Sequence, residues 1–230
     1  MQAAKRIIVN ADDFGYREDI NRGIIYAHKN GIVKSATILT DREAFESAVS
    51  LAKENPGLKT GLHLDLDGFF DILRPEGKIG DFKSGTFDKY KITDSINRQT
   101  DKFLHSGLRL SHIDGHHHAH LHPLVLPIAA NKAKEFNIPL RFFGSFYNDP
   151  ALAGEMAGML DGLGVKYCPH FINGWYWRNV DENFELAELM THPGFNEMWR
   201  EFEIAKCCDP VLKAYLAEKN IEIISFEDII

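Results

Sequence analysis

Two adjacent aspartates, Asp12 and Asp13, follow the apolar run 7–9 near the start of the chain. Neighbouring side chains of a regular strand point to opposite faces, so both carboxylates can serve one site only where the chain leaves the strand and turns. Gly15 would allow such a turn. Two adjacent carboxylates repel each other and raise one pKa unless a cation lies beside them. The pair therefore predicts a metal site with one carboxylate ligand and one free base, and the alternative is an acidic turn that caps the next helix.

A histidine within a strand-like segment, 61–66, is a second candidate ligand. Strict alternation places Leu62 and Leu64 on one side of this segment and His63 and Asp65 on the other. A carboxylate beside a histidine can orient its ring, as such groups do for metal-bound imidazoles, so we expect Asp65 to orient His63. The alternative is a hydrogen-bonded histidine of the core.

Six of the eleven histidines lie within the eleven residues 112–122. The internal position of this cluster excludes an expression tag, and a surface metal-storage tract would be longer and more repetitive. Imidazole suits zinc, iron, nickel and copper, and two histidines with one carboxylate leave coordination positions open for water and substrate. An open site predicts catalysis rather than a structural role. Asp114, His118 and His120 are further possible ligands, so a second ion is an open alternative.

The elements that must position these residues alternate between short apolar runs and amphipathic segments, a pattern typical of βα units and a parallel sheet. Five crossover helices are indicated, near residues 20–27, 44–52, 92–104, 124–136 and 211–219. Eight strands are predicted, near residues 6–10, 33–39, 59–66, 109–114, 138–143, 165–168, 186–191 and 221–226. The seventh could equally be helical. Polar residues recur where the predicted strands end, which is where parallel α/β folds place their sites. Arg141 and His192 belong to this set, with a surface salt bridge and a helix cap as the alternatives.

Eight strands would close a barrel, so the predicted fold is α/β with a distorted (β/α) TIM-like barrel in a single domain spanning residues 1–230. The weak seventh strand and the long irregular stretch 67–91 account for the distortion. An open doubly wound sheet is the alternative. We interpret 67–91 as a substrate-facing loop or lid, and otherwise as a surface insertion.

The composition excludes several classes of protein. A net charge of −7, from 26 basic and 33 acidic residues, leaves no basic footprint for nucleic acid or an anionic membrane. No apolar run is long enough for a signal peptide or a membrane span. Three cysteines, two of them adjacent, make an unlikely disulfide framework and predict a cytoplasmic protein.

Four segments together, 9–15, 61–64, 112–120 and 192–193, resemble the YdjC-like carbohydrate deacetylase family, which includes chitooligosaccharide deacetylases. The resemblance covers the chain nearly end to end, with the motifs in order and at similar spacing. It implies a distorted (β/α) barrel, commonly a homodimer, with one divalent metal ion that is usually described as magnesium. Zinc or another transition metal is the alternative, because histidine-containing sites accept several ions. The implied substrate is an N-acetylated saccharide, on which aromatic residues such as those at 175–177 could stack.

Carried across by motif, the resemblance implies three metal ligands: Asp13, His63 and His116. It also makes Asp12 the general base and His192 the general acid, and it gives Arg141 the role of holding Asp12 or the substrate. The expected reaction is the removal of acetyl groups from N-acetylated sugars. The alternatives are a metal-dependent phosphoesterase or amidohydrolase on a similar barrel, and a non-catalytic metal- or carbohydrate-binding protein. A pure binding site has no use for a free base beside its ligand, which argues against the last.

Overall fold

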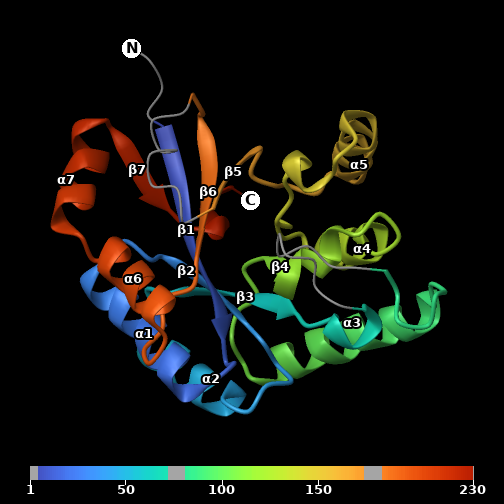
Figure 1. Cartoon of the computed structure of the whole chain (residues 1–230), viewed down its shortest axis with the longest axis horizontal. Helices are drawn as coiled ribbons and strands as arrows, with labels where there is room; N and C mark the ends of the chain where they lie inside the picture. The colour runs from blue at the N-terminus through green and yellow to red at the C-terminus, as the bar shows by residue number, and fades with distance from the viewer. Residues whose placement is uncertain (1–4, 72–80, 174–182, 230) are drawn as a thin grey trace.

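The computed structural model describes residues 5–71, 81–173 and 183–229, and its centre is one curled sheet (Figure 1). Every strand pair in the sheet is parallel, as the sequence predicted. The described strands are β1 (Lys5–Phe14), β2 (Ser35–Ile38), β3 (Lys59–Leu64), β4 (Ile113–Gly115), β5 (His170–Asn173), β6 (Leu186–Thr191) and β7 (Ile221–Ile224). Their order is β4-β3-β2-β1-β6-β5, and β7 also pairs with β1.

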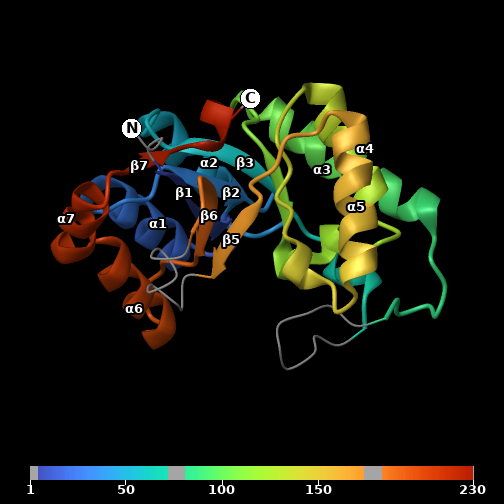
Figure 2. The same ribbon diagram turned by 90° about the horizontal axis from the view of Figure 1, so that it is seen from above.

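The helices follow one another around the outside of this sheet, from α7 and α6 past α1 and α2 to α3, α4 and α5 (Figures 1 and 2). They are α1 (Glu18–Asn30), α2 (Phe45–Glu54), α3 (Lys89–His105), α4 (Leu126–Phe136), α5 (Pro150–Leu163), α6 (Met198–Cys207) and α7 (Pro210–Glu218). Amphipathic spacing explains α1, whose Ile20, Ile24 and Ala27 are fully buried. The five predicted helices are confirmed, and α5 and α6 are two further helices that were not predicted.

The distorted barrel is confirmed, but two of the eight predicted strands are wrong as regular strands. The segment 138–143 contributes one isolated bridge, between Leu140 and Ile113. The segment 165–168 contacts it through a hydrogen bond in which Leu140 N donates to the carbonyl of Lys166 at 2.9 Å. Pro139 and Pro169 have no N–H to donate to a ladder, so regular pairing resumes only at β5. The segments 138–143 and 165–168 therefore lie where two regular strands would have continued the barrel, but they pair only irregularly.

The ambiguous seventh segment is strand β6, which lies between β1 and β5 in the sheet. Ladder pairing on both edges satisfies its backbone groups, and this tertiary pairing outweighs the helical tendency of its alanine, glutamate and leucines.

The predicted loop 67–91 is described only in part. A short 3-10 turn, Asp67–Phe69, opens it, and Phe70 forms an antiparallel bridge with Phe82. Residues 72–80 and the aromatic residues 175–177 lie outside the described residues. No described helix is long and apolar enough to cross a membrane.

Candidate metal centre and active site

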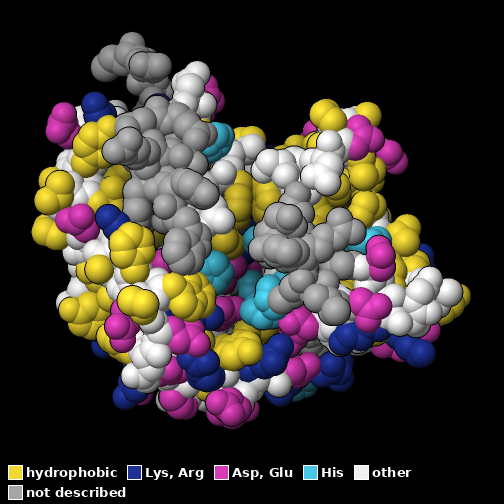
Figure 3. All heavy atoms as spheres, viewed as in Figure 1, with side chains coloured by type: hydrophobic (Ala, Val, Ile, Leu, Met, Phe, Trp, Pro, Cys, Tyr) yellow, Lys and Arg dark blue, Asp and Glu magenta, His cyan; other side chains and the backbone are white. Residues whose placement is uncertain are grey.

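Histidine side chains gather in a hollow near the middle of one face, with acidic side chains around them (Figure 3). The candidate site residues come from the carboxyl ends of parallel strands, where α/β folds place their sites. Asp13 lies near the end of β1, His63 near the end of β3, His116 directly after β4 and His192 directly after β6. The structure brings together all six predicted site residues: Asp12, Asp13, His63, His116, Arg141 and His192.

A bulge in β1 lets adjacent aspartates face the same site. The register between β1 and β2 shifts between Ala11 and Phe14, and Asp13 adopts a left-handed conformation with φ of 69°. Aspartate tolerates this region better than most residues do. Gly15 follows with φ of 91°, and a Cβ there would lie 2.8 Å from the carbonyl oxygen of Leu39. The turn that the sequence required therefore begins inside the strand, two residues before Gly15.

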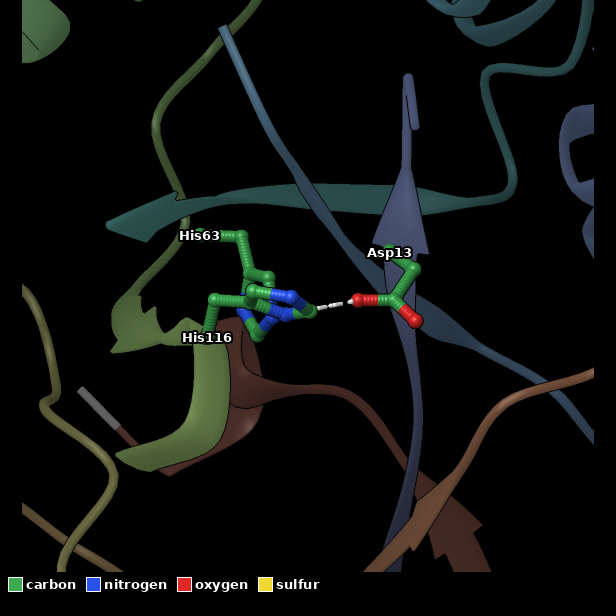
Figure 4. A group of neighbouring side chains, drawn as sticks. All are labelled: Asp13, His63 and His116. Carbon is green, nitrogen blue, oxygen red and sulfur yellow. Dashed lines mark ion pairs between the residues drawn. The ribbon is translucent and has the colours of Figure 1, made fainter. Parts of the chain in front are cut away.

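Three donor atoms converge on one point, as Figure 4 shows for Asp13, His63 and His116. Asp13 Oδ1 lies 3.0 Å from Nδ1 of His116 and 3.6 Å from Nε2 of His63. This oxygen is buried, and it has no well-formed hydrogen bond with any described residue. A buried carboxylate oxygen without a hydrogen bond is costly unless a cation lies beside it. The three side chains therefore fit a divalent ion of the kind bound by two imidazoles and one carboxylate.

A carboxylate orients His63, but it is Asp114 and not Asp65. Nδ1 of His63 lies 2.6 Å from Asp114 Oδ1, which leaves Nε2 facing Asp13. Burial opposes protonation of His63, but the Asp114 carboxylate outweighs burial and raises the pKa of His63 to about 10. Asp65 instead pairs with Arg42 at 2.7 Å. The predicted alternation failed at Asp65 because β3 ends one residue earlier, at Leu64.

Arg141 is completely buried and holds Asp12 with two hydrogen bonds. Its two terminal nitrogens donate to Asp12 Oδ2 and Oδ1 at 2.6 and 2.7 Å, and Asn10 Nδ2 donates to Oδ1 at 2.9 Å. Burial favours the protonated form of Asp12, but the guanidinium outweighs it and holds the pKa of Asp12 well below its ordinary value. Asp12 is therefore a carboxylate at any working pH.

One guanidinium serves three buried carboxylates at this site. Besides Asp12, Arg141 donates through Nε to Glu188 Oε1 at 2.7 Å and lies 3.0 Å from Asp114 Oδ2. Burial raises the pKa of Glu188 to about 7, and the charges of Asp114 and Asp12 add to this effect. A raised pKa means that Glu188 takes up a proton more readily than Asp12 does.

His192 faces Asp12, with Nε2 lying 4.0 Å from Asp12 Oδ2. Behind it, Glu203 of α6 accepts hydrogen bonds from the His192 backbone N–H and, at 2.6 Å, from the Thr191 hydroxyl. Glu203 Oε2 also lies 3.8 Å from Nδ1 of His192. Burial lowers the pKa of His192, but Glu203 outweighs it, and the pKa is raised.

Sequence reasoning missed Glu203 and its neighbour Arg200, whose NH2 group donates to Asp13 Oδ2 at 2.7 Å. Both charged residues are buried on α6 together with Ile204 and Cys207. These four residues recur at intervals of three and four, which is the spacing of one face of a helix. That spacing was the signal in the sequence that could have predicted the two buried charges.

The other candidate ligands of the histidine cluster do not join the Asp13 group. His118 lies edge-on to Phe143. His120 lies 3.1 Å from the carbonyl oxygen of Arg141, and burial, with Arg141 adding, lowers its pKa to about 3. Asp67 and His117 form a second group that shares His116, although Asp67 is also drawn toward Arg42.

A curled parallel sheet with polar side chains at the carboxyl ends of its strands defines an α/β protein of the (β/α)-barrel kind. Within that class the chain belongs to the YdjC-like protein family, whose family model matches residues 6–218. The chain is 32% identical to a carbohydrate deacetylase of Vibrio parahaemolyticus, covering 98% of this chain and 96% of the relative. It is also 32% identical to a carbohydrate deacetylase of Brevibacillus brevis, covering 97% and 99%.

Solved structures support the fold. A putative cellobiose-phosphate cleavage protein from Enterococcus faecalis matches with a TM-score of 0.81 and 25% identity, covering 98% of this chain and 99% of that one. A lactam utilization protein from Thermus thermophilus matches with a TM-score of 0.56 and 16% identity, covering 98% and 100%. The second likeness shows the shared fold alone.

Proposed function

We propose that this protein is a metal-dependent carbohydrate deacetylase, which removes acetyl groups from N-acetylated sugars. The observation that carries the proposal is the buried Asp13 Oδ1, which faces two imidazoles without a well-aligned hydrogen bond. Beside it, Nε2 of His192 lies 4.0 Å from Oδ2 of Asp12. The names of the two bacterial relatives support the reaction class.

Asp13, His63 and His116 would hold a single divalent ion. When bound, the ion would supply Lewis-acid chemistry, polarising the acyl carbonyl and lowering the pKa of water. Two imidazoles and one carboxylate are typical ligands of zinc and other transition metals, whereas magnesium prefers oxygen ligands. The donor set therefore favours a transition metal, and the family resemblance favours magnesium. Both ions belong in the test.

Asp12 is assigned as the general base. Its carboxylate is ionised and held rigidly by Arg141 and Asn10, so it can orient a water molecule and accept its proton. The same guanidinium makes it a weak base. We therefore expect its contribution at the lower end of the roughly 10²- to 10⁴-fold range that positioned acids and bases supply.

His192 is assigned as the general acid. Glu203 favours its protonated form, so Nε2 can donate a proton to the sugar nitrogen as the carbon–nitrogen bond breaks. The backbone and hydroxyl hydrogen bonds to Glu203 fix the segment that carries this ring. An amine is a poor leaving group unless it is protonated, so the reaction needs this donor.

Chitooligosaccharides are the proposed substrates, on the family resemblance. A cytoplasmic location and a homodimer stay predictions, from cysteine usage and from the family respectively.

The test is acetate release from N-acetylglucosamine and its short oligomers. Purified protein is stripped of metal and reconstituted with Zn²⁺ or Mg²⁺, with Asp12→Asn as the matched control because it keeps the shape of the side chain. Release that requires metal and is lost in Asp12→Asn supports the proposal. A metal-binding protein that releases no acetate, but cleaves a phosphate ester, would replace it with the phosphoesterase alternative.

A further inference from the structure

We propose that Arg200 is a positioning residue that aims Asp13 Oδ1 at the two histidines, and this inference rests on the proposed metal centre. Arg200 extends from α6, and its side chain is only 8% exposed. Its NH2 group donates to Asp13 Oδ2 at 2.7 Å, and its Nε donates to Glu197 Oε2 at 2.7 Å. The guanidinium is therefore hydrogen-bonded to Oδ2, the oxygen of Asp13 that does not face the histidines.

Asp13 needs such a restraint because nothing regular in β1 fixes its side chain. Its backbone is left-handed at a bulge, so the alternation of a strand does not dictate where the carboxylate points. Rotation of the carboxylate would exchange its two oxygens. A hydrogen bond to Oδ2 removes that freedom and leaves Oδ1 aimed at His63 and His116. Outer partners of this kind fix the orientation of metal ligands and raise metal affinity.

Close packing of backbone keeps Arg200 in place. A Cβ added at Gly194 would lie 2.8 Å from Arg200 Cδ, and a Cβ added at Gly23 would lie 2.4 Å from the Cα of Gly194. The segment after β6 is thus pressed between α1 and the Arg200 side chain. Arg200 NH1 also lies 3.4 Å from the carbonyl oxygen of His192. One side chain therefore connects the ligand Asp13 with the segment that carries His192.

Arg200 should affect metal affinity in two opposite ways. Its positive charge should weaken metal binding, whereas its orientation of Asp13 should strengthen it, so the two effects can be separated. A cation beside a ligand weakens metal binding electrostatically. Glu197 offsets that cation through Oε2, and its other oxygen, Oε1, lies 3.1 Å from Arg17. Removing Arg200 and the charge of Glu197 together leaves the local net charge unchanged. Loss of the nearer cation would by itself strengthen metal binding, so weaker binding by this variant reports the loss of orientation.

The experiment measures Zn²⁺ affinity of the full chain, stripped of metal, by competition with a chromophoric chelator. The charge-neutral double variant Arg200→Gln/Glu197→Gln should bind Zn²⁺ roughly 10- to 100-fold more weakly than the wild type. Arg200→Lys, which keeps the charge but loses the planar fork, should also bind more weakly. Arg17→Gln is the matched control and should bind as the wild type does.

Absorption of the Co²⁺-loaded proteins supplies a second readout. The ligand-field bands of Arg200→Lys should differ from those of the wild type while the far-ultraviolet circular dichroism is unchanged, which a merely structural role would not produce. Wild-type affinity and bands in both Arg200 variants would overturn the inference and leave the proposed function standing. A wild-type protein that binds neither Zn²⁺ nor Co²⁺ would overturn both.

Discussion

Replacing Arg141 by glutamine should destabilise the protein strongly, because it leaves three carboxylates buried without their shared cation. The guanidinium is completely buried and lies 2.6 to 3.0 Å from oxygens of Asp12, Asp114 and Glu188. Removing one partner of a buried ion pair costs about 3–5 kcal/mol, since the remaining charge keeps its desolvation penalty. We expect a loss of at least this size at pH 7, where Asp12 is ionised.

The same loss can be expressed as a shift in melting temperature. The unfolding entropy of about 2.1 cal/mol/K per residue gives roughly 0.48 kcal/mol/K for 230 residues. A loss of about 3–5 kcal/mol then lowers Tm by roughly 6–10 °C. Arg141→Lys keeps the charge and should recover part of this loss, although it cannot reproduce the paired hydrogen bonds to Asp12.

Thermal unfolding by circular dichroism tests this reasoning against a matched surface pair. Arg98 and Asp41 lie 2.7 Å apart, but the Arg98 side chain is 60% exposed. Arg98→Gln should lower Tm by about 2 °C or less, because exposed pairs contribute about 0–1 kcal/mol. Equal shifts for Arg98→Gln and Arg141→Gln would refute the argument that burial gives the Arg141 cluster its energetic weight.

Three further predictions concern pH and metal. Glu188 has its pKa raised to about 7 from 4.5, so its stabilising contribution is full below pH 4.5 and is lost as pH rises to 7. Glu188→Gln should remove this pH-dependent loss of unfolding free energy, which is up to roughly 3 kcal/mol. If the Tm of Glu188→Gln falls as steeply between pH 4.5 and 7 as that of the wild type, Glu188 is not the titrating group. Glu203→Gln should move the alkaline limb of the pH profile of kcat to lower pH, because His192 loses the carboxylate that raises its pKa. An alkaline limb at the wild-type pH would show that His192 is not the general acid. His192→Asn should lower kcat roughly 10²- to 10⁴-fold with Zn²⁺ affinity unchanged, and a matching loss of affinity would make it a ligand instead.

The positions of the candidate site residues could be predicted from sequence because parallel strands align their carboxyl ends. Asp13, His63 and His192 each stand near the end of a predicted strand. Asp13 belongs to β1, His192 follows its neighbour β6, and His63 lies in β3, one strand removed. The orienting partner of His63 could not be predicted in the same way. It depends on where β3 ends and on the long-range pairing of β3 with β4, which places Asp114 opposite His63.

The gap in the barrel wall was harder to foresee. Pro139 and Pro169 each remove a ladder donor, a local signal that outweighs the apolar character of the two segments. The roles of Arg200 and Glu203 were hidden for a different reason. Charged residues on a helix are ordinarily solvated, and only packing of α6 against the site buries them.

Titrating the metal-stripped protein with Zn²⁺, while acetate release from an N-acetylated sugar is followed, tests the central claim most directly. One ion held by Asp13, His63 and His116 predicts activity that rises linearly and stops at one equivalent, with Asp13→Asn inactive throughout. Full activity in the stripped protein, or a rise that continues to two equivalents, would contradict it.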